Sequence, residues 1–187
     1  TIECRAGDYS KQFAAALSIK AYPAMTYQGL LDSLNSLRME YTITQSFRFY
    51  DRYLAKTRLR DQQQDMQQTK EESNRQTEQI DEAFEEAASG DAGYGQHHFS
   101  LMCYADSQEQ LNHHVGEIIA LFSDRDIVCI REDVGCECAF WAQLPGNFAY
   151  IVRAAEISTK NMAAFASLHN DPVGQMQGNF WGNAVTV

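Results

Sequence analysis

Two pairs of adjacent histidines are the residues of this chain best suited to acid–base or metal chemistry. His97 and His98 fall in an alternating segment typical of a strand, where neighbours face opposite sides, so only one of them can enter a given site. His113 and His114 fall beside the apolar stripe of a predicted helix. Because no nucleophile or metal-ligand constellation accompanies either pair, we interpret all four as structural side chains.

Two of the five cysteines, Cys136 and Cys138, have a spacing that would suit half of a metal site. The other half would need nearby Cys or His at a recognisable spacing, and none follows. Residues i and i+2 of a helix also point to different faces. We therefore expect structural thiols, and an odd number of cysteines without a framework spacing fits a reducing compartment.

Nucleotide chemistry has no sequence support. The chain lacks a Gly-x-x-x-x-Gly-Lys-Ser/Thr loop, and no serine lies in a Gly-x-Ser-x-Gly elbow. The one Gly-x-Gly, Gly93-Tyr94-Gly95, precedes a predicted strand instead of opening a helix, so we expect a flexible exit from a helical segment there. From the histidine, cysteine and glycine patterns we therefore expect no catalytic, cofactor-binding or metal-binding residue in this chain, and no cofactor.

Composition narrows the classes of partner. Hydrophobic residues make up 44% of the 187 positions, which is enough for a packed core. The formal net charge of -10 repels phosphate groups, so nucleic acid and anionic lipid are not expected as main partners. No apolar run approaches the roughly 20 residues that span a bilayer. The chain does not begin with Met and stops in the apolar stretch 184–187, so we expect an excised fragment.

The elements that would position these residues form two similar halves. Residues 13–22 and 40–50 alternate as strands around a short helix capped by Thr26. Residues 97–105 and 126–132 repeat this arrangement around an amphipathic helix. This is an α+β pattern, the split βαβ repeat of a ferredoxin-like fold: one four-stranded antiparallel sheet with two helices on one face. The predicted core includes Leu34, Ile43, Leu101, Val115 and Ile119.

Residues 51–88 interrupt the repeat with seven Gln, no Gly, no Pro and few apolar side chains. We expect a projecting helical hairpin whose second arm starts at Ser73, and a purely solvated, flexible insertion is the open alternative. The chain then divides into a first half (1–50), a helical insertion (51–93), a second half (94–133) and a helical tail with linker (134–187).

Five short motifs follow one another in the second part of the chain. Residues 89–95 fit SG-x-x-x-YG, residues 142–147 resemble xLPGN/H, and residues 157–165 resemble an S-x-N-(F/M)-A helix. Residues 169–174 are similar to HN-x-P-x-G, and residues 178–186 to GN-x-WG-x-AVT. In this order the motifs resemble the CagE/TrbE/VirB family of type IV secretion ATPases.

The resemblance implies a parent protein that hydrolyses ATP with Mg at the cytoplasmic side of the bacterial inner membrane, peripheral to it. That activity would power pilus assembly and conjugative or effector transfer. The phosphate-binding motifs of the ATPase domain would lie after Val187. This fragment would then be a non-catalytic docking region that holds the motor to inner-membrane subunits and to other copies of the ATPase.

Two other functions remain open. One is a stand-alone ferredoxin-like domain that binds RNA or a small ligand, although the negative charge and the missing aromatic-plus-basic sheet signature count against it. The other is a small enzyme with His97 or His113 as the catalytic residue. The lack of a nucleophile or metal constellation counts against this enzyme.

Overall fold

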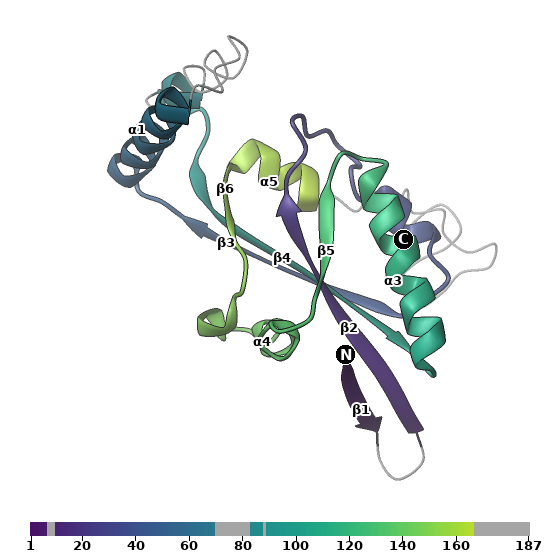
Figure 1. Ribbon diagram of the computed structural model, residues 1–187. Coiled ribbons are helices and arrows are strands. Elements are labelled where there is room, and N and C mark those ends of the chain that lie inside the picture. Colours follow the sequence, from purple (N-terminus) through teal and green to yellow (C-terminus); the bar gives the residue numbers. More distant parts are fainter. Residues whose placement is uncertain (7–9, 70–82, 88, 167–187) are drawn as a thin grey trace, which may run out of the picture.

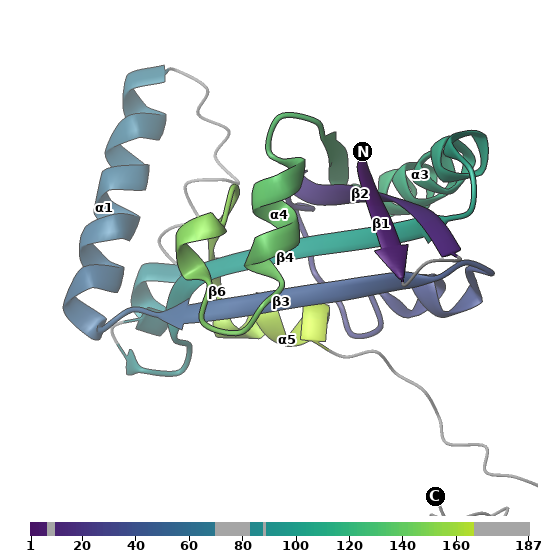
Figure 2. The ribbon, with the colours of Figure 1, turned by 90° about the horizontal axis from the view of Figure 1, so that it is seen from below.

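One antiparallel sheet organises the chain, with helices on both of its faces (Figures 1 and 2). The computed structural model describes residues 1–6, 10–69, 83–87 and 89–166. The fold class is therefore α+β, as the sequence predicts. None of the helices in these ranges is long and apolar enough to cross a membrane.

The four predicted strands are all present. At the centre, β2 (Ser10–Ala21) pairs with β4 (Tyr94–Ala105). The other edge of β4 carries β3 (Tyr41–Phe49), and the other edge of β2 carries β5 (Val128–Glu132). Every pair is antiparallel, so the order across the sheet is β5-β2-β4-β3.

The sheet has six strands among the described residues, and the prediction of four was wrong. The first extra strand, β1 (Ile2–Ala6), forms a hairpin with β2. The second, β6 (Ala155–Ser158), pairs with the first residues of β4, beyond the point where β2 ends. Both segments are short and contain charged residues, whereas the equally short β5 carries the apolar run 128–130 that marks it in the sequence.

The main core lies between the sheet and α3 (Gln108–Ser123). This helix begins after Ser107, whose hydroxyl accepts a hydrogen bond from the Gln110 amide at 3.2 Å. Most of the predicted core is confirmed, because Leu34, Leu101 and Val115 are buried. The remaining two members are half-buried at its margin: Ile43 and Ile119.

The first crossover does not contain the predicted α-helix. It contains the short 3-10 helix η1 (Asp32–Ser36). Its hydrogen bonds join residues three positions apart, for example the Asp32 amide and the Gly29 carbonyl at 3.0 Å. Gly29 has a φ of 81°, a left-handed conformation that stops a regular helix from starting earlier. Thr26 is therefore no N-cap, and its hydroxyl instead donates to the Asn161 side chain at 3.0 Å.

The opposite face of the sheet is covered by α4 (Cys136–Ala142), so helices do not lie on one face only (Figure 2). On this face β2 presents Ala14 and Ala16, which are fully buried against Cys136 and Ala139. Side chains this small let the helix approach the sheet closely. The short 3-10 helix η2 (Phe148–Tyr150) follows α4.

The polar insertion begins as the helix α1 (Arg52–Thr69), which stands at the end of the sheet farthest from α3 (Figures 1 and 2). Residues 83–87 are also helical, and the Phe84 ring lies 5.5 Å from the Arg60 guanidinium. The predicted turn at Ser73 lies outside the described residues. The hairpin and the four-segment division of the chain thus stay predictions.

Candidate functional site

The first candidate site is the junction between the sheet and α5 (Thr159–Ala166), the last described helix. Ser158 caps α5 by accepting a hydrogen bond from the Asn161 amide at 3.1 Å. Gly93 and Thr159 share two hydrogen bonds. The Gly93 carbonyl accepts one from the Thr159 amide at 2.8 Å, and the Gly93 amide donates one to the Thr159 hydroxyl at 3.0 Å. Thus the start of α5 is fixed to the start of β4.

The expectation of a flexible exit at Gly93-Tyr94-Gly95 is wrong. Strand β4 begins at Tyr94, and both glycines are sites of close packing. A Cβ on Gly93 would lie 3.0 Å from the Thr159 methyl carbon. A Cβ on Gly95 would lie 2.6 Å from the Phe47 ring. The glycines therefore let β3 and α5 approach β4.

A chain of hydrogen bonds runs from Tyr22, the residue after β2, through His97 on β4 and Gln45 on β3 to α5. Nδ1 of His97 lies 2.8 Å from the Tyr22 hydroxyl, and its Nε2 lies 3.0 Å from the Gln45 side-chain oxygen. The Gln45 amide nitrogen donates to the Phe165 carbonyl at 3.0 Å. This fixes the tautomer assignment: Nε2–H donates to Gln45, and Nδ1 accepts from Tyr22.

Burial keeps the His97 ring neutral. The residue is 0% exposed, and burial followed by the neighbouring His98 lowers its pKa to about 4. Burial also raises the pKa of the Tyr22 phenol, so this partner keeps its proton. Both ring nitrogens already have hydrogen-bond partners, which leaves none for a metal ion or a substrate. The arrangement suits a fixed link between strands and helix.

Aromatic packing reinforces this link. The Phe165 ring is fully buried, with its centroid 5.4 Å from the rings of Tyr22 and His97. The far side of α5 is held by an ion pair between Lys160 and Glu86, at 2.5 Å. The sequence motif located this helix but not its partners, because those come from strands far away in the chain.

The remaining sequence candidates have separate surroundings. His114 is buried with Nδ1 3.1 Å from the Tyr104 carbonyl, and His113 lies at the surface, 3.4 Å from Glu117. Cys136 is buried, whereas Cys138 is exposed. Within the described ranges no three His, Cys, Asp or Glu side chains gather as a metal site would require.

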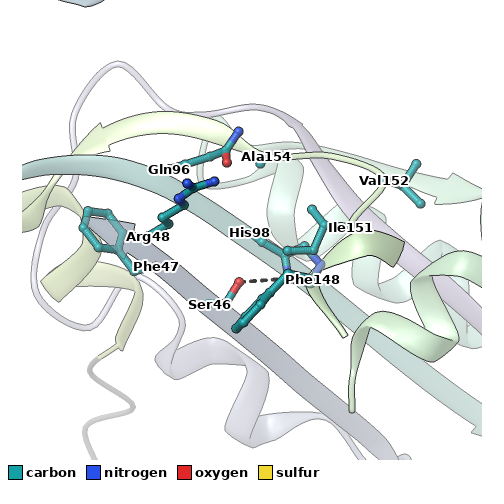
Figure 3. Close-up of a pocket in the computed structure, with 9 residues that line it drawn as sticks. All are labelled: Ser46, Phe47, Arg48, Gln96, His98, Phe148, Ile151, Val152 and Ala154. Atoms are coloured by element: carbon teal, nitrogen blue, oxygen red, sulfur yellow. Dashed lines mark hydrogen bonds between the residues drawn. The ribbon is translucent and has the colours of Figure 1, made fainter. Parts of the chain in front are cut away.

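The second candidate site is a cavity of about 500 Å³ on the α4 face of the sheet (Figure 3). Its floor is made of two cross-strand pairs, Ser46 with His98 and Arg48 with Gln96. The opposite wall is largely apolar and comes from the segment after α4, while Phe47 lies between Ser46 and Arg48 on β3 and pairs with His97 of the other face. The segment after α4 contributes Phe148, Ile151, Val152 and Ala154.

His98 lies on the floor of this cavity and thus on the face opposite to His97, as the alternation predicts. The residue is 4% exposed, and burial lowers its pKa. Its Nδ1 lies 3.5 Å from the Ser46 hydroxyl, at the limit of a hydrogen bond. No sequence signal marked the cavity, whose lining combines two strands with a segment 50 residues further along the chain.

This α+β chain is a member of a secretion-system family. The sequence model of the "CagE, TrbE, VirB family, component of type IV transporter system" matches residues 4–153, so the chain belongs to that family. The match includes most of the N-terminal part, where the motifs gave no signal.

Three relatives illustrate the similarity. The Type IV secretion system protein virB4 of Bartonella henselae is 35% identical over 187 residues, which is 100% of this chain and 24% of the relative. Protein virB4 of Rhizobium radiobacter is 35% identical over 168 residues, 90% of this chain and 21% of the relative. The Type IV secretion system protein virB4 of Brucella suis is 32% identical over 187 residues, which is 100% of this chain and 22% of the relative. The chain thus spans less than a quarter of the length of these relatives.

Proposed function

We propose that this chain is a non-catalytic docking region of a type IV secretion ATPase. Membership of the CagE, TrbE, VirB family is the observation that carries the proposal. Relatives named as type IV secretion system proteins align with the whole chain, and most of their length lies beyond the aligned part. The activity of the whole protein would be ATP hydrolysis with Mg, which would power pilus assembly and conjugative or effector transfer.

The α5 junction supports a mechanical role for the docking region. A motor that pulls on its anchor needs a rigid connection, and α5 is tied to β4 by two hydrogen bonds and to β3 by a third. The buried Phe165 ring adds apolar packing to these bonds. Force applied to α5 would therefore reach the central strands without first bending a loop.

The core is proposed to be ferredoxin-like. Its strand order β5-β2-β4-β3 is the order that a split βαβ repeat generates, with η1 in place of the first helix and α3 as the second. The projecting insertion would then be a helical hairpin that meets a partner subunit. The proposed partners are inner-membrane subunits of the secretion system and other copies of the ATPase, at the cytoplasmic side of the inner membrane.

The RNA-binding and enzymatic alternatives have less support. The chain carries a formal net charge of -10, and His97 uses both ring nitrogens for internal hydrogen bonds. Among the described residues, His113 contacts one carboxylate at the surface and no nucleophile. Neither histidine is therefore placed as a catalytic acid or base would be.

Two measurements on the 187-residue chain test the proposal. Calorimetric titration with Mg-ATP is expected to give no saturable heat, because the sequence has no phosphate loop. Co-purification with the inner-membrane subunits of the same secretion system is expected to retain the chain on at least one of them. Saturable ATP binding would contradict the non-catalytic role, and retention on none of the subunits would contradict the docking role.

A further inference from the structure

The floor of the 500 Å³ cavity is polar, whereas the part of this sheet face under α4 is made largely of Ala14, Ala16 and Met102. The β2 part of the face is sealed by α4, whereas the β3–β4 part carries Ser46, Arg48, Gln96 and His98 beneath an open space (Figure 3). A volume of this size is within the range of roughly 300–1,000 Å³ that is usual for small-molecule sites. The cavity therefore has room for a ligand.

The walls opposite the floor offer apolar surface that the fold leaves uncovered. Phe148 is 66% exposed and Val152 is 41% exposed, although both line the cavity. Ile151 adds half-buried apolar surface. A ligand with an apolar body would remove this surface from water, at about 25 cal/mol per Å².

Arg48 is the one charged side chain in the lining, and it stands exposed at the mouth of the cavity. Two carboxylates of the described chain that could compete for Arg48 are already engaged by other side chains. Glu156 accepts a hydrogen bond from Tyr50 at 2.9 Å and pairs with Arg58 at 3.5 Å. Glu132 pairs with Arg153 at 2.5 Å. Among the residues that the structure describes, Arg48 makes no ion pair and can receive an external anion.

A second polar group in the lining lacks a full set of partners. The buried His98 ring has only the 3.5 Å contact with Ser46 among the described residues, and that contact uses Nδ1. The other nitrogen, Nε2, is not among the buried side-chain atoms that lack a partner, so water or a polar atom of a ligand in the cavity can bond to it.

We propose that the cavity binds a carboxylate carried on an apolar body. The carboxylate would accept two parallel hydrogen bonds from the Arg48 guanidinium, with the Gln96 amide beside it. The apolar body would lie between Phe148, Ile151 and the floor, with a polar atom within reach of His98. Such a carboxylate occurs in a free apolar acid and at the C-terminus of a peptide, and the cavity chemistry is the same for both. This inference is independent of the docking role.

Amide chemical shifts of the 187-residue chain, followed by NMR during ligand titration, test the proposal. Octanoate represents the free acid, and N-acetyl-leucyl-phenylalanine represents the peptide terminus. Their neutral counterparts are octanol and the dipeptide amide. At least one acid is expected to bind saturably, shift amides of β3, β4 and residues 148–154, and bind about tenfold more tightly than its neutral counterpart. The acid that binds identifies the source of the carboxylate.

Three variants locate the interaction. Arg48→Gln removes the charge at the mouth and is expected to weaken the binding of the acid about tenfold. Ala154→Phe fills the cavity from an exposed wall position and should abolish binding. The matched control Arg38→Gln removes an exposed arginine that does not line the cavity, so affinity should not change. Binding of neither acid, equal binding of the neutral analogue, or an unchanged affinity in Arg48→Gln would overturn the proposal.

Discussion

The hydroxyl of Tyr22, the residue after β2, lies 2.8 Å from Nδ1 of His97 on β4, although 75 positions separate them in the chain. Removing this hydroxyl in Tyr22→Phe leaves a buried acceptor on His97 without its donor. We expect a loss of about 1–3 kcal/mol in the free energy of unfolding, the usual cost of an unsatisfied buried polar group. Urea denaturation measures the change.

Tyr27→Phe is the matched control for this variant. The Tyr27 hydroxyl accepts a hydrogen bond from Arg125 at the surface, where water replaces a lost partner. Its effect should stay within about 0.5 kcal/mol. Equal effects of the two variants would mean that the Tyr22–His97 hydrogen bond contributes no more than a surface contact.

The same histidine predicts how stability depends on pH. His97 has a pKa of about 4 in the fold, against an ordinary value of 6.5 for histidine. Below pH 6.5 the unfolded chain therefore binds a proton that the folded chain does not, and stability falls as pH decreases towards 4. The full loss is on the order of 3 kcal/mol. His98, whose pKa burial also lowers, acts in the same direction.

Urea denaturation of His97→Gln between pH 7 and pH 4 isolates the contribution of His97. Glutamine does not titrate, so stability should fall less steeply over this range than in the unchanged chain. Parallel pH profiles for the two proteins would show that His97 does not cause the loss of stability.

Two glycines predict opposite effects of the same substitution. Gly95→Ala places a methyl group against the Phe47 ring and the Arg48 carbonyl, and should destabilise the fold by about 1–3 kcal/mol. Gly116 lies within α3 and has no atom within 4 Å of an added Cβ. Gly116→Ala should therefore stabilise by about 0.5–1 kcal/mol. Thermal unfolding of both variants checks the sign of each effect.

Leu101 and Ile119 are buried to different extents, so shortening them should reduce the free energy of unfolding by different amounts. Leu101 is 0% exposed in the middle of β4, so Leu101→Ala should cost about 2–5 kcal/mol. Ile119 is half-buried at the margin of the core, so Ile119→Ala should cost about half as much because less apolar surface is lost. Equal costs in urea denaturation would show that the two sites are packed alike.

Local periodicity explains which parts of the fold the sequence predicts. Alternation in 13–22 and 97–105 located the central strands, and the stripe from Leu111 to Phe122 located α3, because each pattern extends over many residues. The burial of Leu34 was also predicted correctly. The secondary structure around Leu34 was predicted incorrectly as an α-helix, because the positive φ of Gly29 leads into the tighter 3-10 helix η1.

The sites depend on contacts that have no local signal. His97 meets Gln45 and Phe165, which lie 52 and 68 positions away, and no periodic pattern relates such residues. The cavity likewise needs the segment 148–154 to cross the face of β3 and β4. The short sequence motifs in the second part of the chain identified the family. They could not show which strands the residues of these motifs contact.

The last prediction concerns the insertion as a docking element. Its base is packed onto the fold: Ala55 and Leu59 are buried, and Arg58 pairs with Glu156 of β6. Arg60 already contacts Phe84, so a short Gly-Ser linker can replace residues 62–82 without disturbing this base. We expect the variant chain to keep its thermal stability but to lose co-purification with a partner subunit, since the projecting surface is gone.

Complementation by the full-length protein with the same replacement tests this role in cells. Secretion should be abolished while the protein accumulates at its normal level. The matched control is Lys56→Gln, which changes one charge at the base of α1 and leaves the projecting part intact. If secretion survives the replacement, the insertion is a tolerated loop, and the docking surface must lie elsewhere on the chain.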